Sequence, residues 1–172
     1  EALEYEETID ELLKSFDSLD DLPQPRFDVR HGSRDPGYRP GPEEDPYNVF
    51  IRKCNIRGAT EGKLAGKRVG VKDSIMVAGV PMTCGSRILM DGYVPDVDAV
   101  VIERLLNEGA TIVGTLNQDE FGRGGTGETS SFGYTRNPRD PDYSPGGSSS
   151  GSGAAVAAGE VDIALGLDAR GS

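Results

Sequence analysis

The chain has 172 residues, of which 18 are Lys or Arg and 29 are Asp or Glu, giving a formal net charge of −11. So acidic a composition argues against nucleic acid as a partner, because phosphate groups are bound by lysine and arginine side chains. The longest apolar runs, such as residues 154–158, are far shorter than the roughly 18 residues of a membrane-spanning helix, so we expect no membrane association.

The first 46 residues divide into a helix and an irregular strap, which we predict to form one unit. Apolar residues recur at helical spacing over residues 6–20, with acids on the other face, and predict an amphipathic helix. Such a helix can bind a partner, but packing on its own domain is the more common outcome and is the one we expect. Residues 21–46 are dense in Pro, Gly and charge, which favours an extended strap. Whether residues 1–34 wrap the protein or form a homodimer stays open.

Residues 47–172 form the second predicted unit and show the alternation of strand and helix typical of an α/β fold. Short strands are predicted over residues 67–71 and 111–116, with a further extended piece over residues 74–80. Strand, helix and strand with short joints indicate a βαβ unit, and hence a sheet that is buried on both faces.

The helix of this βαβ unit lies between the two predicted strands. Asp96 or Asp98 can cap its N-terminus, and Gly109 follows its end as a stop signal. After a long polar loop, small residues over 152–158 predict another helix, and residues 162–167 predict a final strand.

The histidine and cysteine content limits the chemistry. The single histidine, His31, lies in a segment rich in Arg, Pro and Gly, which is a poor anchor for an oriented base, so we interpret it as a surface residue. Histidine-based serine or cysteine catalysis and a histidine-rich zinc site are therefore disfavoured. Cys54 and Cys84 are too few for a disulfide framework and lack metal-ligand spacing. We expect reduced thiols, no metal and a cytoplasmic protein.

The stretch SPGGSSSGSG at residues 144–153 has the composition of a flexible linker. An apolar run follows it directly, which instead favours a glycine-rich turn that opens a helix and presents backbone N–H groups. A phosphate-binding loop is the first functional alternative, but no lysine follows the glycines and the GxGxxG spacing is absent. Nucleophilic serine chemistry is the second, and its base then has to be a lysine or a carboxylate.

Lys72 is the best candidate for such a base among the five lysines. It follows the apolar residues RVGV in the segment VGVKDS. Burial at this position would disfavour the charged ammonium and lower the pKa of the amine toward neutrality. By pattern alone a lysine at the end of a strand is more often a surface residue, and that alternative stays open.

Several motifs in order resemble the amidase signature family. They are GKRVGVKDSIMVAGVPMTCGS, TLNQDEFGRGGTGETSSFGYTRNPRD, SPGGSSSGSGAAVAAGEVDIALG and GLDARGS. The resemblance implies the N-terminal part of the amidase signature fold, a mixed β-sheet core flanked by helices. PGYRPGPEEDPYNVF and YVPDVDAVVIERLLNEGATIVG most resemble monofunctional amidases of nitrile metabolism. The loop around NQDEF also resembles the amidotransferase subunits that hydrolyse glutamine for tRNA-dependent amidation.

The resemblance also implies a Ser-Ser-Lys catalytic arrangement that needs no cofactor. The family's lysine falls on Lys72, and its bridging serine, held by a cis peptide, falls on Ser148. Its nucleophile falls on Ser172, 24 residues after Ser148. Ser149, Ser150 and Ser152 are interpreted as loop hydrogen-bonders or helix caps, and Ser149 is the nearest alternative for the bridging role.

The family's oxyanion donors fall on the backbone of four consecutive residues, Ala169, Arg170, Gly171 and Ser172. Leu167 and Arg170 depart from the family pattern, which has small residues at both positions, and Arg170 crowds a loop that has to approach the substrate. The family also continues for several hundred residues past its nucleophile. We therefore expect this chain to be an N-terminal portion, and its activity in isolation stays open.

These motifs favour an amidase that hydrolyses a small-molecule carboxamide to a carboxylic acid and ammonia through an acyl-enzyme. A glutamine-hydrolysing amidotransferase subunit for tRNA-dependent amidation is one alternative. A non-catalytic amidase-like scaffold is the other; Arg170 favours it, whereas the joint presence of Lys72, Ser148 and Ser172 argues against it.

Overall fold

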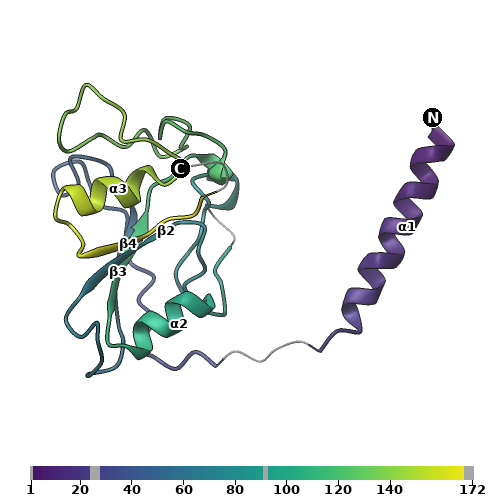
Figure 1. The fold of residues 1–172 in the computed structure, drawn as a ribbon, viewed down its shortest axis with the longest axis horizontal. Coiled ribbons are helices and arrows are strands. Elements are labelled where there is room, and N and C mark those ends of the chain that lie inside the picture. Colours follow the sequence, from purple (N-terminus) through teal and green to yellow (C-terminus); the bar gives the residue numbers. More distant parts are fainter. Residues whose placement is uncertain (1, 24–27, 91–92, 169–172) are drawn as a thin grey trace.

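The computed structural model describes residues 2–23, 28–90 and 93–168. Its elements in chain order are α1 (Ala2–Asp20), β1 (Phe50–Arg57), β2 (Arg68–Lys72), η1 (Arg87–Leu89), α2 (Val100–Asn107), β3 (Thr111–Leu116), η2 (Glu120–Gly122), α3 (Ser150–Ala157) and β4 (Ile163–Leu165). This mixed α/β arrangement, with a mixed sheet flanked by helices (Figure 1), is the fold that the resemblance implies.

Four strands form one sheet in the order β1-β3-β2-β4. The central strand β2 runs parallel to both β3 and β4, and β1 pairs with β3 in the antiparallel direction. The unit β2-α2-β3 is therefore the predicted βαβ unit. Residues 74–80 contain turns and no strand, where an extended piece was expected. Strand β1 is an element that the sequence pattern did not predict.

Two apolar clusters pack on the sheet, one beside each of the helices α2 and α3. The cluster beside α2 contains Val69, Val71, Ile102, Leu106 and Ile112. The cluster beside α3 contains Phe50, Val113, Leu116, Ala154 and Ala155. In β2, Val69 and Val71 belong to the first cluster, whereas Gly70 between them faces the Leu116 side chain of the second, so the two clusters lie on opposite sides of the sheet. The strand that ends in Lys72 is thus buried on both faces from Val69 onward.

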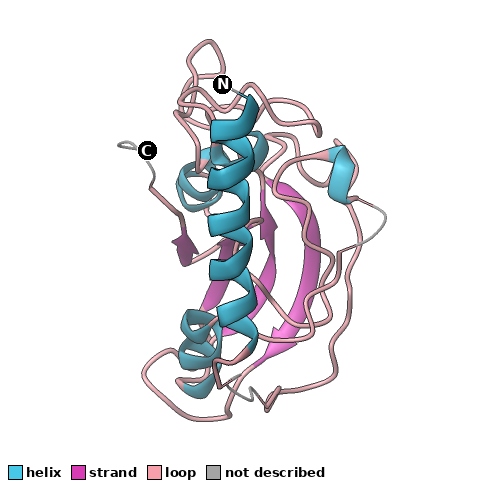
Figure 2. Ribbon diagram, turned by 90° about the vertical axis from the view of Figure 1, so that its right-hand side faces the viewer, coloured by secondary structure: helices cyan, strands magenta, loops and turns pink. Residues whose placement is uncertain are grey.

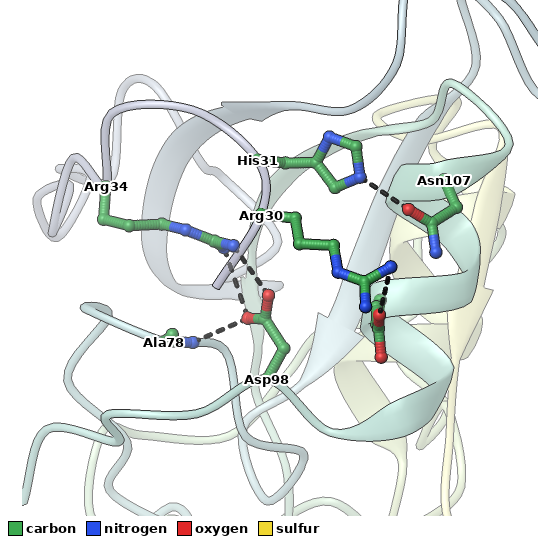
Figure 3. A network of polar contacts seen from close by, with 7 residues as sticks. Arg30, His31, Arg34, Ala78, Asp98 and Asn107 are labelled. Carbon is green, nitrogen blue, oxygen red and sulfur yellow. Dashed lines mark hydrogen bonds and ion pairs between the residues drawn. The ribbon is translucent and has the colours of Figure 1, made fainter. Parts of the chain in front are cut away.

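The strap packs beside α2 through a network of polar contacts (Figure 3). Arg34 pairs with Asp98 at 2.6 Å, and Asp98 also accepts a hydrogen bond from the backbone of Ala78 at 2.8 Å. His31, which is half-buried, contacts the Asn107 side chain at 2.7 Å. The Asp98 carboxylate therefore binds the strap through Arg34. The N-cap of α2 is Ala99, without a side-chain hydrogen bond, so the prediction of a cap by Asp96 or Asp98 is wrong.

Helix α1 is confirmed as a helix and begins four residues before its predicted start. Its apolar stripe is exposed at Tyr5, Ile9, Leu12, Leu13, Phe16 and Leu19. The helix stands apart from the sheet in Figure 1 and crosses in front of it in the view of Figure 2. The prediction that it packs on its own domain is therefore wrong for this structure. The division between residues 46 and 47 stays a prediction. No helix of the described ranges is long and apolar enough to cross a membrane.

Candidate active site

Lys72 is the last residue of β2, and its side chain is only 1% exposed. Its Nζ donates hydrogen bonds to Ser148 Oγ at 2.6 Å, Ser149 Oγ at 2.9 Å and the carbonyl oxygen of Leu167 at 3.0 Å. The three acceptors lie in segments far along the chain from Lys72, and only the fold brings them to it. The alternative that Lys72 is a surface residue is wrong.

Burial has the largest effect on the pKa of the Lys72 amine. Removal from water lowers the pKa of Lys72 because it disfavours the ammonium form. The negative charges of Asp119 and Asp168 act in the opposite direction, and the loss of solvent outweighs them. A larger share of neutral amine, which has a lone pair and can accept a proton, follows from this balance.

Ser148 is 2% exposed and lies in the turn before α3. The peptide bond between Gly147 and Ser148 is cis, as the resemblance implies. Glycine is required before it, because a Cβ at residue 147 would lie 2.2 Å from Asp119 Oδ2 and 2.8 Å from the amide nitrogen of Gly127. Although residues 144–153 have the composition of a flexible linker, their glycines allow a closely packed turn.

The remaining serines of the cluster have separate partners. Ser149 is the N-cap residue of α3, but its hydroxyl does not cap the helix; it contacts Lys72 and donates to the Leu167 carbonyl at 3.0 Å. Ser150 Oγ lies 3.1 Å from the Thr135 hydroxyl, and Ser152 Oγ donates to the Leu165 carbonyl at 2.8 Å. Ser150 and Ser152 are therefore residues of α3 that bond other segments of the fold and not loop residues, whereas Ser149 and Ser148 both contact Lys72.

The polar loop that follows β3 supports this arrangement and was not singled out residue by residue from the sequence. Asn117 is fully buried and joins three segments: its Nδ2 donates to the Asn48 and Gly133 carbonyls, and its backbone oxygen accepts from Gly151 at 2.9 Å. Asp119 is also fully buried, and its backbone N–H donates to the Ser148 carbonyl at 3.0 Å. The sequence feature that could have pointed to Asn117 and Asp119 is the run of polar residues directly after a buried strand.

Asp73, which follows Lys72, is a second buried carboxyl that the sequence reasoning left without a role. Its Oδ2 accepts hydrogen bonds from the Thr83 backbone N–H at 3.0 Å, the Thr83 hydroxyl and the Gly85 N–H. Burial raises the pKa of the Asp73 carboxyl, and these hydrogen bonds oppose the rise. Asp73 therefore holds the 83–85 loop beside the end of β2.

The structure thus brings together two of the expected catalytic residues, Lys72 and Ser148. The other expected residues, Ser172 and the oxyanion positions Ala169, Arg170 and Gly171, lie outside the described residues. Across the described ranges, no group of three or more His, Cys, Asp or Glu side chains is arranged to hold a metal ion.

Comparison with known proteins shows the family of this chain. The sequence pattern of the Amidase family matches residues 52–172. The chain belongs to the amidase family. Among its relatives, the A subunit of the glutamyl-tRNA(Gln) amidotransferase of Halobacterium salinarum is 56% identical over 125 residues, covering 73% of this chain and 29% of that protein. The corresponding protein of Sulfurisphaera tokodaii is 59% identical over 112 residues, covering 65% of this chain and 24% of that protein.

Solved structures of the amidase family share the fold. The A subunit of the glutamyl-tRNA(Gln) amidotransferase of Thermotoga maritima aligns with a TM-score of 0.66 at 44% identity, covering 71% of this chain and 27% of that chain. The allophanate hydrolase of Kluyveromyces lactis aligns with a TM-score of 0.56 at 36% identity, covering 60% of this chain and 17% of that chain. This amidase chain therefore spans less than a third of the length of these relatives.

The comparisons change the expected subtype of amidase. The relatives with 56–59% identity named above are amidotransferase subunits. The expectation of a monofunctional amidase of nitrile metabolism is not confirmed, and the amidotransferase alternative is the better supported of the two.

Proposed function

We propose that this chain supplies the base and the relay serine of a glutaminase-type amidotransferase subunit, which hydrolyses the side-chain amide of glutamine to glutamate and ammonia. The observation that carries the proposal is the buried Lys72 amine, 2.6 Å from the hydroxyl of Ser148. The identity to amidotransferase relatives over most of the chain supports the choice of glutamine over other carboxamides.

The hydrogen bonds around Lys72 indicate which proton the amine receives. A neutral amine has two N–H groups and one lone pair. The Leu167 carbonyl can only accept, and the Ser149 hydroxyl already directs its own proton to that carbonyl. The two N–H groups of Lys72 therefore go to Ser149 Oγ and the Leu167 oxygen, and the lone pair faces Ser148 Oγ. In this state the Ser148 hydroxyl donates to Lys72.

Ser148 then acts as a proton relay toward the nucleophile that the resemblance places at Ser172. As the Ser148 proton moves to Lys72, Ser148 Oγ accepts the proton of the Ser172 hydroxyl, whose oxygen forms a bond to the amide carbon. The proton held by Lys72 returns through Ser148 to the leaving nitrogen when the C–N bond breaks, and ammonia departs. Water deacylates the ester along the same relay, which restores Ser172.

The backbone of Ala169, Arg170, Gly171 and Ser172 is proposed to stabilise the tetrahedral oxyanion. A single such donor is worth about 3 kcal/mol of transition-state stabilisation. We further propose that the ammonia is used by another subunit of the amidotransferase. Because the chain carries a net charge of −11, we assign contacts with tRNA to that partner and not to this chain.

Ammonia release from glutamine by the full-length protein tests the proposal. Lys72→Ala and Ser148→Ala should each lower kcat by about 10²–10⁴-fold, the usual contribution of a positioned proton-transfer group. Lys67→Ala is the matched control, because Lys67 lies just before the same strand but is exposed; its kcat should not change.

Three outcomes distinguish the alternatives. A higher kcat/KM for glutamine than for acetamide or benzamide supports an amidotransferase component, and the reverse order supports a stand-alone amidase. Undiminished turnover in Lys72→Ala would overturn the mechanism. Absence of turnover by the wild-type protein with every amide, in the presence of its partner subunits, would support the scaffold.

A further inference from the structure

Asp119 is a buried carboxylate whose hydrogen-bond partners are all uncharged. Its Oδ2 accepts from the Gly127 N–H at 3.1 Å, and its Oδ1 accepts from the Thr129 N–H at 3.0 Å and the Thr129 hydroxyl at 2.8 Å. Over the described ranges, no lysine or arginine forms an ion pair with it within 4 Å. Hydrogen bonds therefore satisfy both oxygens of this carboxylate, but no ion pair neutralises it, so its negative charge acts on groups nearby.

The main chain of Asp119 is bonded to the turn that carries the relay serine. Its N–H donates to the Ser148 carbonyl at 3.0 Å. Its side chain occupies the space that two glycines leave open: a Cβ at Gly147 would lie 2.2 Å from Asp119 Oδ2, and a Cβ at Gly124 would lie 2.4 Å from Asp119 Cγ. Asp119 is therefore in direct contact with the cis peptide before Ser148.

Two carboxylates act on the Lys72 ammonium, and they differ in exposure. Both Asp119 and Asp168 raise the pKa of Lys72, against the larger lowering by burial. Asp168 is exposed, whereas Asp119 is fully buried. Because water and salt screen an exposed charge far more than a buried one, the charge of Asp119 acts on Lys72 with less attenuation. Asp73, the third nearby carboxylate, bonds the 83–85 loop.

We propose that Asp119 is a positioning residue of this site: its buried charge offsets the desolvation of the Lys72 amine, while its backbone N–H holds the carbonyl of Ser148. The proposal rests on the proposed function, in which Lys72 is the base and Ser148 the relay. Asp119 thereby influences both the proton affinity of Lys72 and the position of the Ser148 hydroxyl, from which Lys72 accepts a proton.

The proposal makes a prediction about pH that a purely structural role does not make. Without the charge of Asp119, the Lys72 ammonium loses a stabilising interaction, so the pKa of Lys72 should fall further and the acid limb of the rate profile should move to lower pH. A side chain that only supports the loop would instead lower the rate at every pH and leave the limb in place.

The decisive experiment is a titration of Lys72 in Asp119→Asn, followed by NMR of ¹³Cε-labelled lysine in the full-length protein. The Lys72 signal is the one that disappears in Lys72→Met. We expect the pKa of Lys72 to be lower in Asp119→Asn than in the wild type, because the variant lacks the negative charge that favours the ammonium form. An unchanged pKa in a folded variant overturns the proposal. The titration requires no turnover, so its outcome is separate from that of the glutaminase assay.

Two control variants separate charge from structure. Thr129→Val removes one hydrogen bond to Asp119 but keeps its charge, so the pKa of Lys72 should not move. Asp168→Asn removes the exposed carboxylate, and its shift should be smaller than that of Asp119→Asn; a larger shift contradicts the assignment. If Asp119→Asn fails to fold, Asp119→Ser removes the same charge with a side chain that crowds Gly124 and Gly147 less, and the same shift is expected.

Discussion

Two glycines of α3 offer a matched test of how closely this helix has to approach the sheet. A Cβ at Gly151 would lie 2.5 Å from the Asn117 nitrogen and 2.6 Å from the Val49 carbonyl oxygen, and both atoms belong to the backbone. A Cβ at Gly153 has no heavy atom within 4 Å. The substitutions Gly151→Ala and Gly153→Ala therefore make the same chemical change in one helix, with opposite consequences for packing.

The expected magnitudes follow from these distances. Gly153→Ala should raise the free energy of unfolding by about 0.5–1 kcal/mol, the usual gain of alanine over glycine in a helix. At Gly151 the contact is about 0.9 Å too short (3.4 − 2.5), so the helix has to move or the backbone has to strain. Overpacking of this kind typically costs about 1–3 kcal/mol. Both variants gain the same helix propensity, so we expect Gly151→Ala to be less stable than Gly153→Ala by the overpacking cost, about 1–3 kcal/mol.

The same displacement should reach the site, because Ser148 and Ser149 lie directly before α3. A shift of about 1 Å would lengthen the contact between Lys72 Nζ and Ser148 Oγ from 2.6 Å beyond hydrogen-bond range. Urea unfolding measures the stability difference, and ammonia release from glutamine measures the effect on turnover. Equal stabilities of the two variants, within about 0.5 kcal/mol, would refute the reasoning from close approach.

Two further predictions concern charged groups. Arg34→Ala should lower the free energy of unfolding by about 3–5 kcal/mol, because Asp98 would keep a buried, unpaired charge. Arg30→Ala should lower it by less than about 1 kcal/mol, since the ion pair of Arg30 with Glu103 spans 3.7 Å at the surface. Similar urea midpoints for the two variants would contradict this reasoning. The lowered pKa of Lys72 means that the unfolded state binds more protons between that pKa and the ordinary lysine value of about 10.4. The free energy of unfolding should rise with pH across this window in the wild type, and an equal rise in Lys72→Met would exclude Lys72 as its source.

Local sequence patterns predicted those elements whose own residues favour the structure that they adopt. Residues 111–116 are apolar and β-branched, and β3 has these bounds. Strand β1, by contrast, reads FIRKCNIR, with three cationic residues and no regular alternation. It becomes a strand because it pairs with β3, about sixty residues later in the chain, with two interruptions in the register. A pattern over a few residues cannot predict pairing between strands that lie so far apart in the sequence.

Asp98 shows the same limit for a side chain. Its position before a helical stretch is typical of an N-cap. In the structure, Arg34, 64 residues away, binds its carboxylate, and the backbone of Ala78 takes a further hydrogen bond. A tertiary ion pair therefore replaces the local cap, because both charged groups are largely buried and each needs the other.

The sequence by itself determined the kind of chemistry: with one histidine, a serine nucleophile needs a lysine or carboxylate as its base. Through the resemblance, it also placed the proposed relay serine in the glycine-rich turn. Only the tertiary structure decided the environment of Lys72, the proposed base. The acceptors of the Lys72 amine lie 76, 77 and 95 residues along the chain, and the buried charge of Asp119 comes from a third segment. The pKa of a lysine depends on burial and on neighbouring charges, and both are properties of the folded chain.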